Sequence, residues 1–280
     1  MKIISENQIS ELVCTLFLRC AYCVTEDVTK AVQSALDFEE SPAGRAALCQ
    51  ILENHKIAKE QRLPICQDTG MAVVFAKVGC QAVINGDFNA AINAGVRRAY
   101  AEGFLRKSVV TDPLFDRRNT MDNTPAIIHA ELVPGDGIEL LVTAKGFGSE
   151  NMSAIRMLSP GDGEKGVIDF VVETVEKAGP NPCPPVIVGV GIGGTMEHAA
   201  LLAKKAAIRE LGSHNDDARY AALEQDLLKR INRLGIGPAG TGGRATALGV
   251  NVLFAPTHIA GLPVAVNICC HAARHAKGSI

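Results

Sequence analysis

The sequence predicts a mixed α/β fold, in which an N-terminal helical part packs on an α/β body built around a mixed sheet. Residues 6–60 carry apolar side chains at the three- and four-residue spacing of helices. From residue 63 onward, apolar runs typical of strands alternate with helical segments. No repeat, low-complexity run or long linker divides the chain. We therefore expect a single domain over 1–280, with a helical part at 1–60 and an α/β part at 61–280.

The helical part contains recognisable helix starts. Ile9, Val13 and Leu16 recur on one helical face, as apolar residues do again around 48–52. Polar residues that favour helix N-termini stand at Thr25 and at Ser41, the latter directly before a proline. The sequence thus predicts several helices that pack together before the sheet begins.

The body shows clear strand and helix patterns. Predicted strands are MAVVFAKVG (71–79), VIVGVGIGG (186–194), ALGVNVLFA (247–255) and GLPVAVNI (261–268). Residues 127–146 predict a hairpin that turns at Pro134–Gly137. Predicted helices lie within 83–105 and over 167–179, 196–211 and 217–235.

Composition excludes several classes of protein. Of the 280 residues, 47% are hydrophobic and 21% charged, which is ordinary for a globular protein. A net charge of −2, 4% aromatic residues and no Trp disfavour nucleic-acid binding. Charges interrupt the N-terminal segment, so it does not resemble a secretory signal, and no run approaches the roughly 20 apolar residues of a membrane span. We expect a cytoplasmic protein with neither a nucleic-acid nor a membrane partner.

Nine cysteines are a high count for such a chain, and without a secretory signal we do not expect disulfides. A closed zinc site usually shows two close cysteine pairs, whereas only Cys20 and Cys23 have that spacing here. These two lie among apolar residues, so we interpret them as core packing, with a redox pair as the alternative.

Cys66, Cys183 and Cys270 stand beside turns or at strand ends, where loops present side chains to a shared site. Three thiolates are one short of a closed four-ligand metal site. An iron–sulfur cluster held by three cysteines would instead leave one iron open. Buried structural cysteines are the simpler interpretation of the same pattern, and both stay open on the residues alone.

Six segments together resemble a known family. They are CQDTG (66–70), NTPAIIHAELVPGD (123–136), AKGFGSENMS (144–153), CPPVIVGVGIGGTMEHAALLAKKA (183–206), INRLGIGPAGTGG (231–243) and PTHIAGLPVAVNICCHAARHA (256–276). In this order they resemble the α subunit of class I, iron–sulfur-dependent fumarases and the related L-tartrate dehydratases. The resemblance runs from about residue 5 to the end of the chain. It implies an α-type catalytic domain of an iron–sulfur hydro-lyase.

The resemblance also implies the cofactor and its ligands. A [4Fe–4S] cluster would be held by Cys66, Cys183 and Cys270, and its one open iron would act as a Lewis acid on a hydroxyl group. Cys269 is adjacent to the third ligand. We prefer Cys270 because the family pattern places this cysteine four residues before an arginine, which Arg274 satisfies. Adjacent side chains of an extended segment also point to opposite sides, so we do not expect both cysteines to bind one iron.

The remaining site residues follow from the same resemblance. Asp68 matches an aspartate that hydrogen-bonds the substrate hydroxyl, and Arg106 matches an arginine that binds a substrate carboxylate through its guanidinium fork. Gly146 and Gly148 match a loop whose backbone N–H groups approach substrate, and His258 matches a histidine near the second carboxylate. Without the resemblance, Asp68 would be a turn cap, Arg106 a solvated arginine and His258 a surface histidine.

The expected function is the reversible hydration of fumarate to malate, carried out with a separate β subunit in a higher αβ oligomer. The base that removes the carbon-bound proton is expected on the β subunit, so the α subunit alone should be inactive. An L-tartrate dehydratase α subunit is the nearest alternative, and a non-catalytic metal-binding subunit with a closed zinc site is another.

A nucleotide-binding module is a further alternative, because residues 189–194 match G-x-G-x-x-G between a strand and a helix. The acidic residue expected about 20 positions later would be Glu210, which falls in a predicted helix rather than at the end of a strand. We therefore attribute these glycines to close packing of the strand on the helix.

Overall fold

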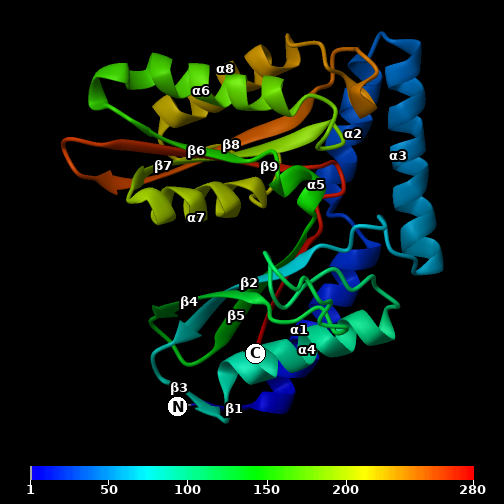
Figure 1. Cartoon of the computed structure of the whole chain (residues 1–280), viewed down its shortest axis with the longest axis vertical. Helices are drawn as coiled ribbons and strands as arrows, with labels where there is room; N and C mark the ends of the chain where they lie inside the picture. Colours follow the sequence, from blue (N-terminus) through cyan, green and yellow to red (C-terminus); the bar gives the residue numbers. More distant parts are fainter. Residues whose placement is uncertain (1) are drawn as a thin grey trace. The chain divides into compact units, whose positions relative to one another are not determined.

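The computed structural model describes residues 2–280, and these residues form two compact units. The first unit comprises the residues up to Thr25 together with His55–Phe147 and Arg274–Ile280, and the second comprises Glu26–Asn54 and Gly148–Ala273. The mixed α/β class is confirmed (Figure 1). Each unit has its own sheet and its own apolar core, so the predicted helical part is divided between the two.

The first unit is built on a four-stranded sheet in the order β10-β5-β2-β4. Its strands are β2 (Met71–Gly79), β4 (Ile127–Val133), β5 (Ile138–Lys145) and β10 (His275–Ser279). The helices α1 (Glu6–Tyr22) and α4 (Phe88–Glu102) share a core with alternate β2 residues such as Val74 and Ala76. Strands β1 (Lys2–Ser5) and β3 (Ala82–Asn85) pair in parallel and form a separate two-stranded sheet.

The predicted hairpin over 127–146 is wrong in its pairing. Both strands exist, but β2 lies between β4 and β5, parallel to the first and antiparallel to the second. The connection passes across the end of β2, where the Gly79 N–H donates to the Gly137 carbonyl at 2.9 Å. A Cβ at Gly79 would lie 2.5 Å from the backbone of Gly135, so only glycine permits this crossing.

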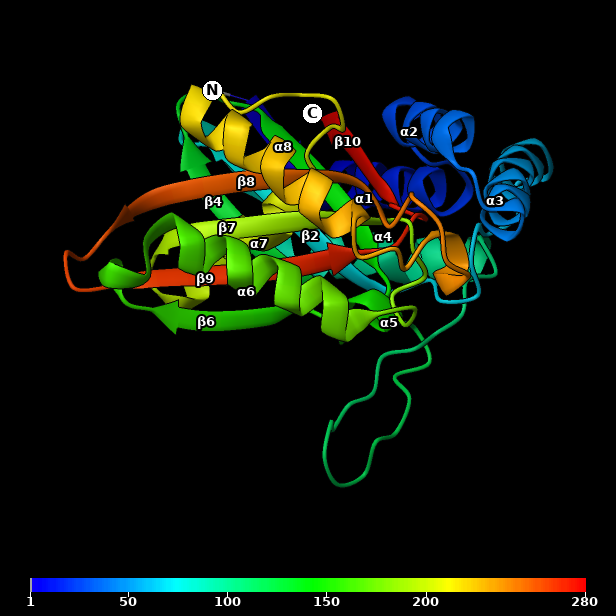
Figure 2. The same cartoon turned by 90° about the horizontal axis from the view of Figure 1, so that it is seen from above.

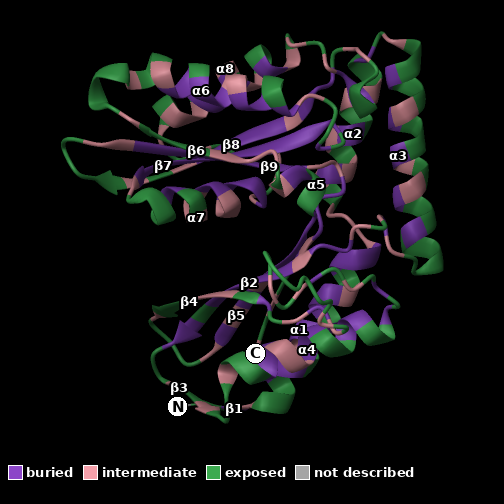
Figure 3. Ribbon diagram, viewed as in Figure 1, coloured by how far each residue is buried: buried purple, intermediate pink, exposed green. Residues whose placement is uncertain are grey.

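The second unit is built on a sheet in the order β6-β9-β7-β8. Its strands are β6 (Ala154–Leu158), β7 (Val186–Gly194), β8 (Ala247–Thr257) and β9 (Leu262–Cys269). The helices α6 (Gly163–Ala178) and α8 (Ala218–Asn232) cover one face, and α7 (Met196–Ala207) covers the other (Figure 1). Figure 3 shows the centre of this sheet as buried, as expected for the apolar run of β7.

The glycines of β7 allow α7 to pack directly on the strand. A Cβ at Gly189 would lie 2.1 Å from the carbonyl oxygen of Ala203, and one at Gly191 would lie 2.1 Å from that of Ala199. Because α7 presents small residues to the strand, the α7 backbone packs directly against the β7 backbone, and no side chain fits between them. This contact accounts for the first two glycines of the G-x-G-x-x-G pattern and supports the packing interpretation.

The predicted helix starts are confirmed. Helix α2 (Glu26–Phe38) follows Thr25, and α3 (Pro42–Gln61) begins after Ser41, whose hydroxyl accepts from the Gly44 N–H at 3.3 Å. The short helices are α5 (Phe147–Glu150), η1 (Pro160–Asp162) and η2 (Pro238–Gly240). Strands β1, β3, β6 and β10 were not predicted, and α7 ends four residues earlier than predicted.

Cys20 and Cys23 belong to the first unit's core. Cys20 is fully buried, and burial raises the pKa of its thiol to about 12, while Cys23 packs against the same core. Such a thiol is unreactive at neutral pH, which supports core packing over a redox pair. Within residues 2–280, no helix has both the length and the apolar character needed to cross a bilayer.

Candidate functional site

The CQDTG segment forms a tight turn directly before β2. Asp68 lies at its centre: one carboxylate oxygen, Oδ1, accepts from the Gly70 N–H at 3.0 Å, and the other, Oδ2, accepts from the Phe147 N–H at 2.8 Å. The Asp68 N–H itself lies 3.4 Å from the Cys66 sulfur. Gly70 has φ +74°, and a Cβ there would lie 2.7 Å from the backbone of Lys145. The turn therefore holds Cys66 and Asp68 in fixed relative positions.

A buried arginine, Arg274, completes this arrangement and was missed as a site residue. Its side chain is 3% exposed, and its Nη1 donates to the Asp68 carbonyl oxygen. A Cβ at Gly146 would lie 3.0 Å from Arg274 Nη2 and 3.2 Å from Asp68 Oδ2, which explains why residue 146 is glycine. The only signal in the sequence was its spacing from Cys270, which we used to choose a cysteine rather than to assign Arg274 a role.

Arg106 lies in the long irregular segment after α4, over residues 103–126 (Figure 2). The base of this segment is tied to the Cys66 turn at two points. The Thr69 hydroxyl donates to the Arg106 carbonyl at 2.6 Å, and the buried Asn123 amide donates to the Gly70 carbonyl at 3.0 Å. The structure thus brings Arg106 to the same turn as Asp68, with its side chain exposed.

Cys183 and Cys270 lie at the same end of the second unit's sheet. Strands β7 and β9 are antiparallel, with Ile187 opposite Cys269, so Cys183 precedes β7 where Cys270 follows β9. Cys269 is buried at 6% exposure, whereas Cys183 is exposed and Cys270 half-buried. An accessible Cys270 beside a buried Cys269 fits the choice of Cys270 as the ligand.

His258 lies at the opposite end of that sheet. It occupies the turn between β8 and β9, where its Nδ1 accepts from the Ala260 N–H at 3.1 Å. Thr257 pairs with Gly194 at the far end of β7, about 25 Å from the strand's beginning at ~3.3 Å per residue. The structure therefore does not bring His258 together with Cys183 and Cys270 of the same chain.

Gly148 is exposed at the start of α5, and a Cβ there would meet only the Asn181 carbonyl oxygen, at 3.8 Å. Two residues on, Glu150 forms a polar group that the sequence did not predict. Its carboxylate pairs with Lys204 of α7 and accepts from the Asn267 amide of β9 at 2.9 Å. These partners come from distant segments, so no local pattern signals them.

The predicted cluster ligands are divided between the units, with Cys66 in the first and Cys183 and Cys270 in the second. In the part of the chain that the structure describes, no three His, Cys, Asp or Glu side chains form a group that could hold a metal, and no disulfide is present. All three thiols are at least partly accessible, and thiolates are the ligands that iron–sulfur clusters take. Their convergence on one cluster stays a prediction.

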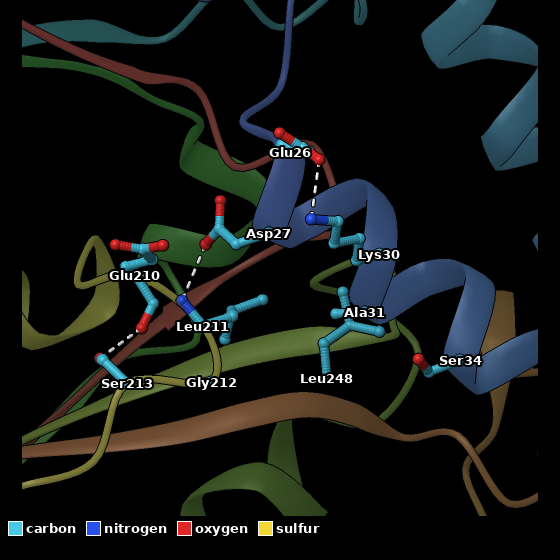
Figure 4. Close-up of a pocket in the computed structure, with 10 residues that line it drawn as sticks. All are labelled: Glu26, Asp27, Lys30, Ala31, Ser34, Glu210, Leu211, Gly212, Ser213 and Leu248. Atoms are coloured by element: carbon cyan, nitrogen blue, oxygen red, sulfur yellow. Dashed lines mark hydrogen bonds and ion pairs between the residues drawn. The ribbon is translucent and has the colours of Figure 1, made fainter.

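A separate groove in the second unit lies between α2 and the turn after α7 and encloses about 620 Å³ (Figure 4). Its lining includes Glu26, Asp27 and Glu210, with Lys30 as the one basic side chain. Asp27 accepts from the Leu211 N–H at 2.7 Å, and Lys30 pairs with Glu26 at 2.7 Å. This lining repels a dicarboxylate and contains no predicted site residue, so the groove is not the expected substrate site.

Comparison with known proteins defines the class. The chain matches the sequence model of the family described as fumarate hydratase (Fumerase) over residues 10–279. A Methanocaldococcus jannaschii protein with the provisional name L(+)-tartrate dehydratase subunit alpha is 44% identical over 277 residues, which cover 96% of each chain.

Bacterial relatives give the same result. An Escherichia coli L(+)-tartrate dehydratase subunit alpha is 33% identical over 278 residues, covering 98% of this chain and 90% of its own length. A Shigella boydii protein of the same name is 32% identical over the same span. This chain therefore belongs to the fumarate hydratase family, a family of hydro-lyases. The resemblance seen in the sequence is confirmed.

Proposed function

We propose that this chain is the α subunit of a [4Fe–4S] hydro-lyase that hydrates fumarate reversibly to malate together with a separate β subunit. The observation that carries the proposal is the turn that joins Cys66 to Asp68. The Asp68 carboxylate is oriented by the Phe147 N–H, and the buried Arg274 lies beside Asp68. This joins a thiolate ligand and a proton-handling group in one rigid element, as an iron-dependent hydro-lyase requires.

The cofactor would be held by Cys66, Cys183 and Cys270. When bound, it supplies an open iron that polarises the carbon–oxygen bond of the substrate. The accessible positions of Cys183 and Cys270 at one sheet end, and of Cys66 on its turn, support this ligand set.

The chain's own residues bind and orient the substrate. Asp68 accepts two backbone N–H groups and lies next to a guanidinium, which places its carboxylate to exchange a proton with the substrate hydroxyl or water. Arg106, exposed at the same turn, would bind one substrate carboxylate through its guanidinium fork. The Phe147 N–H is already taken by Asp68, so the exposed Gly148 is the loop residue that would approach substrate. The general base is expected on the β subunit.

His258 would act on the site of a neighbouring α subunit. At about 25 Å from the end of its own sheet that carries Cys183, it cannot touch a ligand held there in the same copy. A higher αβ oligomer, in which two α subunits face each other by two-fold symmetry, would bring the β8–β9 turn of each copy to the site of the other.

A mixture of two variants tests this arrangement. His258→Ala and Cys66→Ser should each be inactive as a pure oligomer. After co-assembly at equal amounts, half of the two-fold assemblies contain one copy of each, and one of their two sites is intact. We expect about a quarter of wild-type activity to return. No recovery from the mixture would contradict exchange of His258 between copies.

L-Tartrate is the second candidate substrate, because the relatives at 44% and 33% identity carry that name. Tartrate has one hydroxyl more than malate, so its site needs an additional polar partner, and discrimination by such a partner is large.

The experiment is a steady-state comparison of fumarate, malate, mesaconate and L-tartrate, using anaerobically reconstituted α and β subunits together and α alone. We expect the highest kcat/KM for fumarate and malate and no turnover by α alone. A higher kcat/KM for L-tartrate would select the second candidate, and full turnover by α alone would refute the divided site.

A further inference from the structure

The carboxylate of Glu39, at the end of α2, is buried in the second unit at 3% exposure. One oxygen accepts from the backbone N–H groups of Glu40 at 3.0 Å and Ser41 at 2.9 Å, and the other from those of Arg244 at 2.8 Å and Ala245 at 2.9 Å. Burial raises the pKa of Glu39, but these backbone donors outweigh it and hold the pKa below its ordinary value. Glu39 is therefore a buried charge joining two distant segments.

The space around this carboxylate is closed by glycines. A Cβ at Gly243 would lie 2.5 Å from Glu39 Oε1, and one at Gly44 would lie 3.1 Å from the Glu39 side chain. Gly243 also has φ +129°, which other residues rarely adopt. Glu39 binds the C-terminal end of the glycine-rich segment 235–246. The close packing of Gly243 against its carboxylate leaves this segment little freedom to move.

This segment in turn holds the loop that carries Cys183. The Ala239 N–H donates to the Pro184 carbonyl at 2.8 Å, directly after Cys183. A Cβ at Gly240 would lie 2.4 Å from Pro180 Cβ, so the backbone of Gly240 packs against the proline ring three residues before Cys183. The segment 235–246 thus contacts both sides of the cysteine loop.

Two strained residues lie at this contact. Cys183 has φ +56° and Ala239 has φ +53°, left-handed conformations that non-glycine residues adopt rarely. Such conformations persist only where the surrounding structure fixes them, and they gather at functional sites. The Cys183 N–H also donates to the Pro180 carbonyl at 3.1 Å, and the segment 235–246 contacts the loop at Pro180 and Pro184.

We infer that Glu39 is a positioning residue for Cys183: by anchoring the segment 235–246 it fixes the cysteine loop in the conformation that binds the cluster. The inference rests on the proposed function for the role of Cys183 as a ligand. The mechanical coupling from Glu39 to Cys183 does not, since it is a property of the protein without cofactor.

The first experiment compares Glu39→Gln with the matched control Glu40→Gln in the full chain, assembled with the β subunit and loaded with iron and sulfide. Glutamine keeps the size of Glu39 but turns one acceptor into a donor that faces two N–H groups. The Glu40 side chain makes an exposed ion pair to Arg244 at 2.7 Å, and exposed pairs contribute little to stability. We expect iron loss to a chelator to be on the order of 10-fold faster in Glu39→Gln, as for other changes behind a metal ligand. We also expect a shifted electron paramagnetic resonance spectrum of the cluster after one-electron reduction, which makes it paramagnetic, with Glu40→Gln like wild type.

The second experiment needs no cofactor. In the apo-protein, Glu39→Gln should raise both the hydrogen exchange of residues 180–185 and 235–246 and the alkylation rate of Cys183 relative to the exposed Cys80. If Glu39→Gln does not fold, Gly240→Ala displaces the same segment against Pro180 and should show the same faster iron loss.

The outcomes separate the two claims. If the wild-type protein binds no iron yet Glu39→Gln loosens both segments, the proposed function fails and the coupling stands. If the foldable variants keep wild-type iron retention, spectrum and Cys183 reactivity, the inference is overturned.

Discussion

Replacing Gly191 by alanine tests why a glycine-rich strand precedes α7. The added Cβ would lie 2.1 Å from the Ala199 carbonyl oxygen and 2.5 Å from the Ala203 nitrogen. Both are backbone atoms of one helix, so no side-chain rotation relieves the clash, and α7 has to move away from β7 by about 1 Å to restore ordinary contact. Forcing one methyl group into such a packed interface costs about 1–3 kcal/mol.

That cost translates into a measurable change in thermal stability. For a chain of this size each kcal/mol shifts Tm by roughly 2–4 °C, so we expect Gly191→Ala to lower Tm by about 2–12 °C. Thermal melting of the apo-protein, followed by circular dichroism, measures this change in Tm. Gly161→Ala is the matched control, because its Cβ would meet only Ser159 Oγ at 3.8 Å, and it should change stability by less than about 0.5 kcal/mol.

The same variant separates packing from nucleotide binding. Calorimetric titration of the wild-type protein with NAD should show no binding, because the glycines serve the contact with α7. An unchanged Tm for Gly191→Ala, or NAD binding that Gly191→Val removes, would refute the packing explanation.

Three further predictions concern the first unit. Asp68→Asn turns one acceptor into a donor facing a backbone N–H, so kcat should fall about 10²- to 10⁴-fold at unchanged iron content; a retained kcat would remove Asp68 from the mechanism. Gly146→Ala places a Cβ 3.0 Å from Arg274 Nη2, and we expect kcat to fall about 10-fold with Tm unchanged, which kinetics and melting curves check together. The pKa of Cys20 is raised to about 12 by burial, so its stabilisation is complete below pH 9 and is lost as the pH rises toward 12. Between pH 8 and 10.5, urea unfolding of wild type should lose about 2 kcal/mol more than that of Cys20→Ala, and equal losses would contradict the assignment.

Local patterns identified most elements but not how the strands pair. The spacing of apolar residues placed α1, β2 and β7 correctly, since each pattern reflects burial of its own segment. The order β10-β5-β2-β4 depends on contacts between distant strands, and a turn at Pro134–Gly137 looks the same whether or not its strands pair. The one available clue was that 71–79 is apolar on both faces, as a central strand is.

In the candidate site too, local motifs identified some residues, whereas others depend on contacts between distant segments. The family motifs located Cys66 and Asp68 on one turn, because both residues lie within five positions of sequence. Arg274 and Glu39 could not be found this way, since each acts on backbone more than 200 residues away along the chain. His258 sits in the expected motif, but only the direction of β7, β8 and β9 reveals that it lies far from Cys183.

We propose that three thiolates from separate segments hold one iron–sulfur cluster whose open iron binds substrate. Mössbauer spectroscopy of the iron-57-loaded αβ protein, with and without malate, tests it most directly. We predict a four-iron spectrum in which malate shifts the signal of one iron and leaves the other three unchanged, and its loss in Cys66→Ser, Cys183→Ser and Cys270→Ser. A spectrum that malate does not alter, or a cluster that survives in any of these variants, would contradict the account.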